Sequence, residues 1–207
     1  MQTKKRIILG SASPRRRELL EQIGISFEVR VSDKEEVYHS LIPEEIVKEL
    51  ALSKAENVAD DLREKQEQVK QISFDKKNNV LLDTIVIGAD TIVVSDGSIL
   101  GKPKDEADAV RMIRSLQGRS HKVYTGVAIL DYDDEGKRKS VVHAVETEVF
   151  VNPMSDEEIR EYAATGEPLD KAGAYGIQGQ FAAYIERIDG DYYNVVGLPV
   201  SYVYRQL

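Results

Sequence analysis

The sequence predicts a mixed α/β fold in which helices flank a single sheet. Two observations support this prediction. Strand-length apolar segments alternate with amphipathic helices in the first half of the chain. Strand pairs joined by turns dominate the second half, which favours a mixed sheet over a purely parallel one. At 207 residues, the chain is long enough to bury a full core, as one large domain or as two intimate lobes.

The first half of the chain begins with an apolar strand and a capped helix. Ser13 is a suitable N-cap residue, and Pro14 suits the first helical position. Residues 60–83 are charged and Gln-rich, so we expect an extended helix end followed by a flexible insertion. The other expected elements are a strand at 6–10, a helix at 14–23, a strand at 27–31, a long helix from Pro43 through Val58, and a strand at 84–94 that is buried on both faces.

The second half of the chain carries strong turn and capping signals. Asp96 and Gly97 predict a tight turn, and Ser155 with Glu158 forms a capping box. The expected elements are a helix capped by Asp105 and closed by Gly118, a hairpin of 121–130 with 141–151, a helix from the capping box to residues 165–166, a glycine-rich loop at 170–179, a hairpin of 181–188 with 193–196, and a short helix from Pro199.

Composition limits the classes of partner. The formal net charge of −8 argues against non-specific binding to nucleic acid or to anionic membranes. The chain has no cysteine, so disulfides, thiolate catalysis and zinc–thiolate sites are excluded. The N-terminal apolar segment is too short for a signal sequence, and no apolar run is long enough to span a membrane. We therefore expect a cytoplasmic location and a small anionic ligand.

Three arginines, Arg15, Arg16 and Arg17, occupy the first turn of the predicted helix at 14–23. The partial positive charge of a helix N-terminus disfavours cations there. A bound polyanion reverses this effect, because it accepts hydrogen bonds from free backbone N–H groups, from the Ser11 and Ser13 hydroxyls and from the guanidinium groups. We therefore predict a phosphate site at residues 11–17, with a solvated basic turn as the alternative interpretation.

Asp90 lies within a nearly continuous apolar run, where a carboxylate is costly to bury unless a charged or hydrogen-bonding group meets it. This position favours a general base or a metal ligand over an aspartate that simply faces water at a strand end. The small residues Gly88 and Ala89 beside it would let a ligand approach closely.

Two lysines are candidates for binding phosphate. Lys54 shares a helical face with Val47, Leu50 and Val58, so it either snorkels from an apolar face or points its ammonium at a phosphate. Lys102 lies in a Gly-Lys-Pro loop just before a predicted helix. The glycine and the proline fix the backbone there more firmly than a solvated lysine requires.

The glycine-rich loop and an acidic pair offer further candidate sites. The loop at 170–179 has three glycines at intervals of three and matches neither a Walker A loop nor the dinucleotide-binding fingerprint. Its Gln178 presents an amide that can both donate to and accept from a base edge, although an ordinary turn remains the alternative. Glu35 and Glu36 form a pair of the kind that hard divalent cations prefer, or simply a charged surface.

Together these segments resemble the Maf family of nucleoside triphosphate pyrophosphatases. The matching stretches occur in the order that the family has and cover nearly the whole chain outside residues 60–83. They are LGSASPRRRELL at 9–20, ALSKA at 51–55, GADT at 88–91, GKP at 101–103, GRSHKVYTGV at 118–127, GEPLDKAGAYGIQG at 166–179 and VGLP at 196–199.

The resemblance implies an elongated α/β fold similar to inosine triphosphate pyrophosphatases, with one domain over residues 1–207 and a central cleft between two lobes. It implies hydrolysis of a nucleoside triphosphate to the monophosphate and pyrophosphate, with Mg²⁺ or Mn²⁺ as cofactor. By this resemblance Asp90 is the catalytic carboxylate, Glu36 and Asp90 hold the metal, and the residues that hold the phosphates are Ser11, Arg15, Arg16, Lys54 and Lys102.

Three positions distinguish the branches of the family. Arg15, Thr91 and Gln178 resemble the branch that prefers dTTP and UTP, whereas the branch that prefers 7-methyl-GTP tends to carry Tyr, Gln and Glu there. The alternatives are activity on 7-methyl-GTP, or a regulator of cell division that binds nucleotide without turnover. Two features depart from the family pattern, the long segment at 60–83 and Lys34 within the acidic segment. No nucleic-acid partner is expected, and the sequence leaves a homodimer open.

Overall fold

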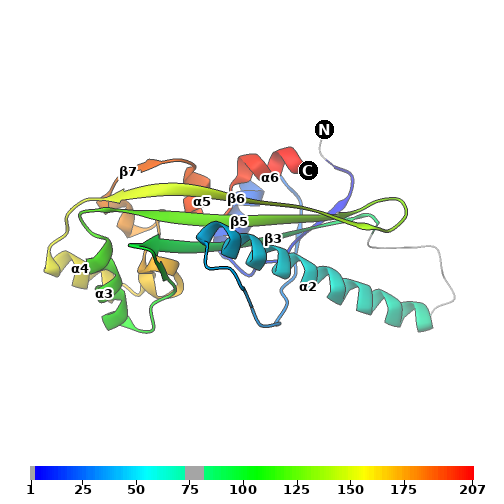
Figure 1. The fold of residues 1–207 in the computed structure, drawn as a ribbon, viewed down its shortest axis with the longest axis horizontal. Coiled ribbons are helices and arrows are strands. Elements are labelled where there is room, and N and C mark those ends of the chain that lie inside the picture. Colours follow the sequence, from blue (N-terminus) through cyan, green and yellow to red (C-terminus); the bar gives the residue numbers. More distant parts are fainter. Residues whose placement is uncertain (1–2, 73–81) are drawn as a thin grey trace.

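One sheet runs along the length of an elongated molecule (Figure 1). The computed structural model describes residues 3–72 and 82–207, and within these ranges the sheet has seven strands in the order β2-β1-β3-β5-β6-β7, with β4 paired to β3. β1 is parallel to β2 and β3, and the other pairs are antiparallel, so the predicted mixed α/β class is confirmed. The strands are β1 (Arg6–Leu9), β2 (Glu28–Val29), β3 (Thr84–Ser95), β4 (Ser98–Leu100), β5 (Ser120–Tyr132), β6 (Arg138–Val151) and β7 (Ile185–Asp189).

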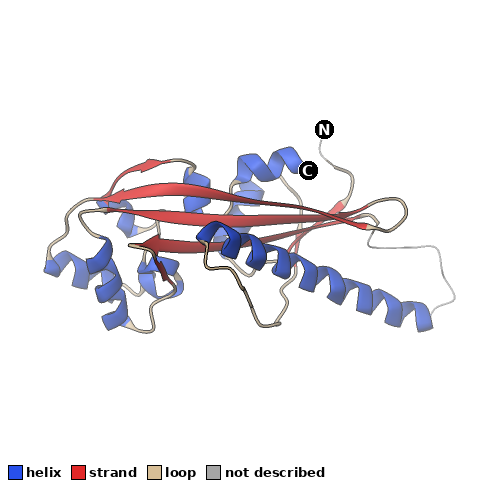
Figure 2. Ribbon diagram, viewed as in Figure 1, coloured by secondary structure: helices blue, strands red, loops and turns tan. Residues whose placement is uncertain are grey.

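Helices flank the sheet on both sides (Figure 2). α2 packs its apolar side on one face, where its alanines and valines meet residues such as Ile8 and Val86. α1, α5 and α6 belong to the core of the other face, and α3 and α4 lie together at one end of the sheet (Figure 1). The helices are α1 (Pro14–Gln22), α2 (Pro43–Ile72), α3 (Glu106–Leu116), α4 (Asp156–Ala164), α5 (Tyr192–Val196) and α6 (Val200–Gln206), with 3₁₀ turns η1 (Glu167–Asp170), η2 (Ala172–Ala174) and η3 (Gln180–Tyr184).

Several predicted elements are confirmed together with the caps that predicted them. Asp105 caps α3 by accepting a hydrogen bond from the backbone N–H of Asp108, and the capping box of Ser155 and Glu158 is complete. The long hairpin forms between β5 and β6. Asp96 has a positive φ of 49°, as the tight turn requires, and this turn leads into β4, a strand that the sequence did not predict.

The predicted hairpin of 181–188 with 193–196 is wrong. Only β7 is extended, and it pairs with β6, whereas residues 192–196 form the short helix α5. The Asp191 side chain accepts a hydrogen bond from the Tyr193 N–H at 2.8 Å and so caps this helix. This local cap outweighs the strand propensity of the tyrosines and valines that follow it. The strand predicted at 27–31 is also shorter, since only two of its residues form β2.

α2 extends well past the end predicted from its apolar periodicity. It continues to Ile72, which confirms the extended helix end expected within 60–83. The flexible insertion predicted after it includes residues 73–81, which lie outside the described residues. None of the helices in the described ranges combines the length and the apolar character needed to cross a bilayer.

Two glycines let α2 approach the sheet at backbone distance. A Cβ on Gly88 would collide with the carbonyl oxygen of Ala51, and one on Gly126 would collide with that of Val47. Gly88 therefore makes room for a helix and not for a ligand, which corrects the role predicted from sequence. Asp90 lies opposite Gly126 across the β3–β5 pair, so this close contact brings α2 directly over Asp90.

Candidate functional site

The site begins at an interruption in the sheet. On the side of β3 away from β5, the β1 ladder ends where Leu9 pairs with Ile87, and the β4 ladder starts only at Val93. Residues 88–92 therefore have no strand partner on that side within the described part of the chain. The backbone after β1 turns away there into the loop that leads to α1. An open strand edge between two neighbouring ladders is a natural place for a binding cleft.

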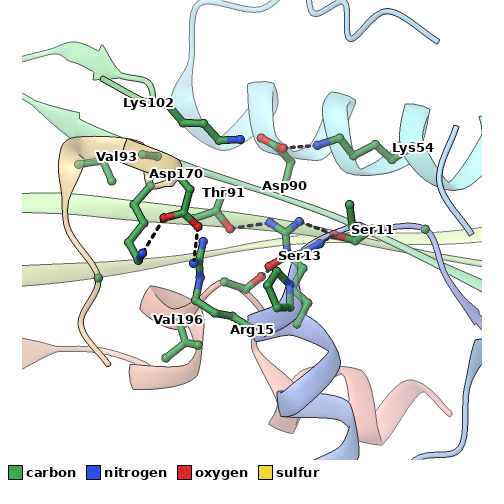
Figure 3. Close-up of a pocket in the computed structure, with 18 of the residues that line it drawn as sticks. Ser11, Ser13, Arg15, Lys54, Asp90, Thr91, Val93, Lys102, Asp170 and Val196 are labelled. Carbon is green, nitrogen blue, oxygen red and sulfur yellow. Dashed lines mark hydrogen bonds and ion pairs between the residues drawn. The ribbon is translucent and has the colours of Figure 1, made fainter. Parts of the chain in front are cut away.

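A pocket of about 420 Å³ lies at this edge, which is within the size range of ligand sites. The structure places ten of the candidate residues on its wall: Ser11, Ser13, Arg15, Arg16, Glu36, Lys54, Asp90, Thr91, Lys102 and Gln178. Figure 3 labels seven of them, while Arg17, the third arginine of the predicted phosphate site, is exposed and does not line the pocket. The ten residues come from six separate stretches of the chain. Glu35 is not among the lining residues, so the geometry favours Glu36 of the acidic pair.

The charge of the pocket is opposite to the charge of the protein. Six cationic side chains and three carboxylates line it, which gives a local net charge of +3 in a chain of net charge −8. Such a local excess favours a polyanionic ligand. The cations are Arg15, Arg16, Lys34, Lys54, Lys102 and Lys171, and the carboxylates are Glu36, Asp90 and Asp170.

Asp90 meets the ammonium group of Lys54. The distance from Lys54 Nζ to Asp90 Oδ1 is 2.5 Å, and Lys54 Nζ also lies 3.1 Å from Glu36 Oε1. The Asp90 side chain is only 14% exposed, so this ion pair offsets the cost of placing a carboxylate in an apolar strand. Lys102 approaches Asp90 from the side opposite Lys54 (Figure 3). A carboxylate between two ammonium groups stands at the centre of the site.

Arg16 is buried and anchors the turn that the sequence predicts to bind phosphate. Its Nε donates to the Gly197 carbonyl at 2.7 Å, its Nη1 to Ser11 Oγ at 3.0 Å and its Nη2 to Thr91 Oγ1 at 3.0 Å. These bonds tie α1 to the end of β1, to β3 and to the turn after α5. Burial lowers the pKa of Arg16, and the nearby Asp90 carboxylate opposes this shift. A guanidinium carries five N–H donors, so two remain for a ligand.

The N-terminus of α1 faces the same pocket. Ser13 is the N-cap residue, as predicted, but its hydroxyl makes no capping hydrogen bond. The Ser13 N–H instead donates to Ser11 Oγ at 3.3 Å. The backbone N–H groups of the first turn therefore lack the usual side-chain acceptor, which leaves them available to an anion.

Asp170 and Lys171 are pocket residues that sequence reasoning missed. Arg15 Nη1 lies 3.4 Å from Asp170 Oδ2, and Lys171 Nζ lies 2.6 Å from Asp170 Oδ1. The ion pairs with Lys171 and Arg15 hold the pKa of Asp170 below its usual value, although burial opposes them. The Asp-Lys dipeptide at the start of the glycine-rich loop was the only signal in the sequence, and the pair of Asp170 with Arg15 depends on a long-range contact with α1.

The glycine-rich loop is shaped by two charged side chains. A Cβ on Gly176 would meet Lys171, and one on Gly179 would meet the Glu167 carboxylate. Glu167 also accepts hydrogen bonds from the Tyr162 hydroxyl at 2.9 Å and from the backbone N–H of Gln180 at 3.0 Å. Two of the three glycines thus admit side chains of the protein itself. The loop that results presents the exposed Gln178 to the pocket.

The donor set for a divalent cation is small. Within the described residues, no three His, Cys, Asp or Glu side chains form a cluster suited to a metal ion. Asp90 and Glu36 are the two carboxylates that converge, and the Lys54 ammonium lies between them. Mg²⁺ is often bound through one or two carboxylates together with phosphate oxygens of the substrate. These residues therefore fit a metal whose coordination the substrate completes.

The fold and the site define an α/β protein with a polyanion pocket built around one aspartate. Residues 6–207 match the family model of Maf-like proteins, so the chain belongs to the Maf family and the resemblance drawn from the sequence is confirmed. A relative from Agathobacter rectalis is 47% identical over 97% of this chain and 95% of its own length. One from Bacillus cereus is 48% identical over 98% and 89%. Both are named dTTP/UTP pyrophosphatase.

Solved structures give a more distant likeness. The Ham1 protein of Staphylococcus aureus covers 82% of this chain and 85% of its own, with a TM-score of 0.39 and 15% identity. A protein from Mycobacterium abscessus, described as a nucleoside-triphosphatase / dITP/XTP pyrophosphatase, covers 70% of this chain and 72% of its own, with a TM-score of 0.33 and 17% identity.

Proposed function

We propose that this protein hydrolyses nucleoside triphosphates, dTTP and UTP among them, to the monophosphate and pyrophosphate. One observation carries the proposal: a pocket of net charge +3 surrounds a single aspartate that pairs with the Lys54 ammonium, with Lys102 on its other side. The names of relatives that are 47–48% identical over nearly the whole chain support the same substrate. A cytoplasmic location and a homodimer remain predictions.

The phosphate tail binds where the cations and free donors converge. The first turn of α1 supplies backbone N–H groups, and Arg15 supplies a guanidinium group beside them. Lys54 and Lys102 lie on the two sides of Asp90 and neutralise charge on the phosphate nearest to it (Figure 3). Fixed donors of this kind stabilise negative charge that grows during the reaction and need no reorganisation.

In the proposed reaction, a water oxygen attacks the α-phosphorus, and the bond from the α-phosphorus to the bridging oxygen breaks. Pyrophosphate leaves with the bridging oxygen, and the water proton moves to the Asp90 carboxylate, which acts as general base. Lys54 and Lys102 offset the charge that develops on the leaving group. The competing role for Asp90 is to hold a metal ion with Glu36.

A divalent cation, when bound at Asp90 and Glu36, supplies charge neutralisation at the phosphates and lowers the pKa of a bound water. Mg²⁺ and Mn²⁺ are both suited to a site in which two carboxylates bind the cation and phosphate oxygens complete its coordination. The Lys54 ammonium lies between these two carboxylates and pairs with both of them.

The base is read at the glycine-rich loop. The amide of Gln178 both donates and accepts, which matches the alternating acceptor and donor edge of uracil or thymine. Thr91 lines the pocket, and its hydroxyl is held by hydrogen bonds to Arg16 and Thr125. Arg15 pairs with Asp170, the first residue of this loop.

The proposal is tested with a panel of triphosphates in the presence of Mg²⁺ or Mn²⁺. The panel contains dTTP, UTP, dCTP, dGTP and 7-methyl-GTP, and pyrophosphate and orthophosphate are measured separately. We expect dTTP and UTP to give the highest kcat/KM, with pyrophosphate as the first product. Orthophosphate as the first product would show that the enzyme does not break the bond between the α-phosphorus and the bridging oxygen. Preference for 7-methyl-GTP would assign the chain to the other branch.

A further inference from the structure

We propose that Thr125, a buried residue outside the pocket, is a positioning residue: through Thr91 and Arg16 it holds the Ser11 hydroxyl where it can donate a hydrogen bond to the bound phosphate. This inference rests on the phosphate site of the proposed function and assigns a role to a side chain that does not touch the ligand. Thr125 lies on β5 and is fully buried, and it is not among the residues that line the pocket.

A chain of hydrogen bonds connects Thr125 to the pocket, and its first bond has a fixed direction. Thr125 Oγ1 lies 2.9 Å from the Asn194 carbonyl oxygen. A carbonyl only accepts, so the single hydroxyl proton of Thr125 is directed to Asn194. Thr125 Oγ1 also lies 2.9 Å from Thr91 Oγ1, and in that contact Thr125 must therefore accept the proton of Thr91.

The orientation of the Thr91 hydroxyl, fixed by Thr125, determines how Thr91 meets Arg16. Because Thr91 donates to Thr125, its oxygen is free to accept from Arg16 Nη2 at 3.0 Å. A guanidinium only donates, so the chain has no conflict at this point. The Gly197 carbonyl accepts from Arg16 Nε, and these two contacts on one edge of the guanidinium fix the plane of the group.

The fixed guanidinium then holds one N–H group against the Ser11 hydroxyl oxygen. Ser11 Oγ accepts from Arg16 Nη1 at 3.0 Å and from the Ser13 N–H at 3.3 Å. Both of its acceptor positions are thus taken, and no acceptor for the Ser11 proton is found among the described residues. Ser11 lies on the pocket wall, so its hydroxyl proton is left for an anionic oxygen. A donor beside a guanidinium suits a phosphate oxygen.

Asn194 holds the far end of the chain in place. Its side chain is fully buried, and its Nδ2 donates to the Val123 carbonyl at 3.0 Å and to Thr147 Oγ1 at 2.9 Å. These bonds join α5 to β5 and β6, so the Asn194 carbonyl presents a rigid acceptor to Thr125. The packing of α5 on the sheet therefore supports the position of the Arg16 guanidinium and, through it, the position of the Ser11 hydroxyl.

The test measures binding of inorganic tripolyphosphate by calorimetry, without turnover. Thr125→Val keeps the shape of the side chain but removes the hydroxyl, and we expect affinity to fall about tenfold, the loss of roughly one charge-assisted hydrogen bond. Thr125→Ser keeps the hydroxyl and should stay within about twofold of the parent protein. The matched control is Ser115→Ala, which removes the hydrogen bond from the exposed Ser115 hydroxyl to the Met112 carbonyl in α3, away from the pocket.

A double-mutant cycle separates positioning from general destabilisation. In a Ser11→Ala background, Thr125→Val should change tripolyphosphate affinity by less than about twofold, because the group it acts through is already gone. Should Thr125→Val fail to fold, Thr91→Val breaks the same chain at a half-buried position and should show the same dependence on Ser11.

Three results would overturn the inference. The first is a folded Thr125→Val protein that binds tripolyphosphate as tightly as the parent, and the second is an equal loss of affinity with and without the Ser11 hydroxyl. A parent protein that does not bind tripolyphosphate at all would also overturn it. A parent protein that binds tripolyphosphate but does not hydrolyse dTTP would contradict the proposed function alone, so the two failures are distinguishable.

Discussion

Asp90 is a carboxylate in an apolar strand, and its environment explains why it is tolerated there. The Lys54 ammonium meets it, and the open edge of β3 exposes it to the pocket. We predict that Asp90→Asn lowers kcat by at least about 100-fold, since an amide neither accepts the proton nor holds a cation as a carboxylate does. Release of pyrophosphate from dTTP measures the effect, and a thermal unfolding curve checks the fold.

The control for this change is Asp96→Asn. Asp96 is an exposed aspartate on the same strand–turn segment and pairs with Arg119 outside the pocket. Its substitution should leave kcat within about twofold of the parent value, as expected for an exposed ion pair. Normal turnover by Asp90→Asn would remove Asp90 from the chemistry.

Gln178 is the residue that we expect to discriminate between bases. Gln178→Glu replaces a group that donates and accepts with one that only accepts, so the ratio of kcat/KM for dTTP to that for dGTP should fall at least about tenfold. Gln180→Glu is the control, because Gln180 is exposed in the same segment but does not line the pocket. An unchanged ratio in Gln178→Glu would show that the base is read elsewhere.

The helix α2 positions Lys54 only because Gly88 and Gly126 have no side chains on the sheet beneath it. Gly126→Ala places a Cβ against the Val47 carbonyl, and α2 has to move away from β5. We expect the free energy of unfolding to fall by about 3 kcal/mol, the upper part of the range for overpacking, and kcat to fall with it as Lys54 leaves Asp90. Urea unfolding measures the first effect and pyrophosphate release the second.

Gly101→Ala is the matched control for overpacking. A Cβ at Gly101 meets nothing within 4 Å, and no positive φ is involved. Its free energy of unfolding should change by less than about 0.5 kcal/mol, as is usual for surface substitutions. Equal stability of Gly126→Ala and the parent protein would contradict the close contact between α2 and the sheet.

Local signals predicted the elements that local bonds hold. The caps at Asp105 and at Ser155 both appear as expected, as does the turn at Asp96. Residues 193–196 were predicted as a strand and instead belong to α5, the helix that the Asp191 side chain caps. Periodicity also failed to predict β4, whose three residues pair with the end of β3. Short elements depend on their neighbours more than on their own sequence.

The candidate site was predictable to a similar degree. The matching stretches at 9–20, 51–55, 88–91, 101–103 and 166–179 each bring at least one candidate residue to the pocket wall. The ion pair of Arg15 with Asp170 and the hydrogen bond of Thr125 with Asn194 were not predictable. Each joins segments that are far apart in the sequence, and nothing in either segment alone indicates its partner.

The stability of the whole molecule should depend on pH through His121. This histidine is buried and shares a 2.7 Å hydrogen bond with the Tyr175 hydroxyl, and burial lowers the pKa of His121 from 6.5 to about 4. The unfolded chain takes up a proton near pH 6.5 whereas the folded protein does not until about pH 4. Protons therefore favour unfolding, and His121 contributes a loss of stability as pH falls from 6.5 to 4.

Between pH 6.5 and 4, His121 should lower the free energy of unfolding by about 3 kcal/mol, and His121→Gln should remove this loss. The measurement is the free energy of unfolding at several pH values for the parent and the variant. The difference between the two curves isolates His121 from the other histidines and the carboxylates. Parallel curves between pH 4 and 6.5 would contradict a neutral, buried His121.

The central claim concerns one pocket at the open edge of β3, in which fixed positive groups hold a triphosphate beside Asp90. The most direct measurement is a crystal structure with a dUTP analogue whose α,β-bridging oxygen is replaced by an imido group. We predict that the phosphate tail contacts Ser11, Arg15 and the first turn of α1, with the α-phosphate beside Asp90 and the base at Gln178. A tail bound away from the serine–arginine turn would contradict the account.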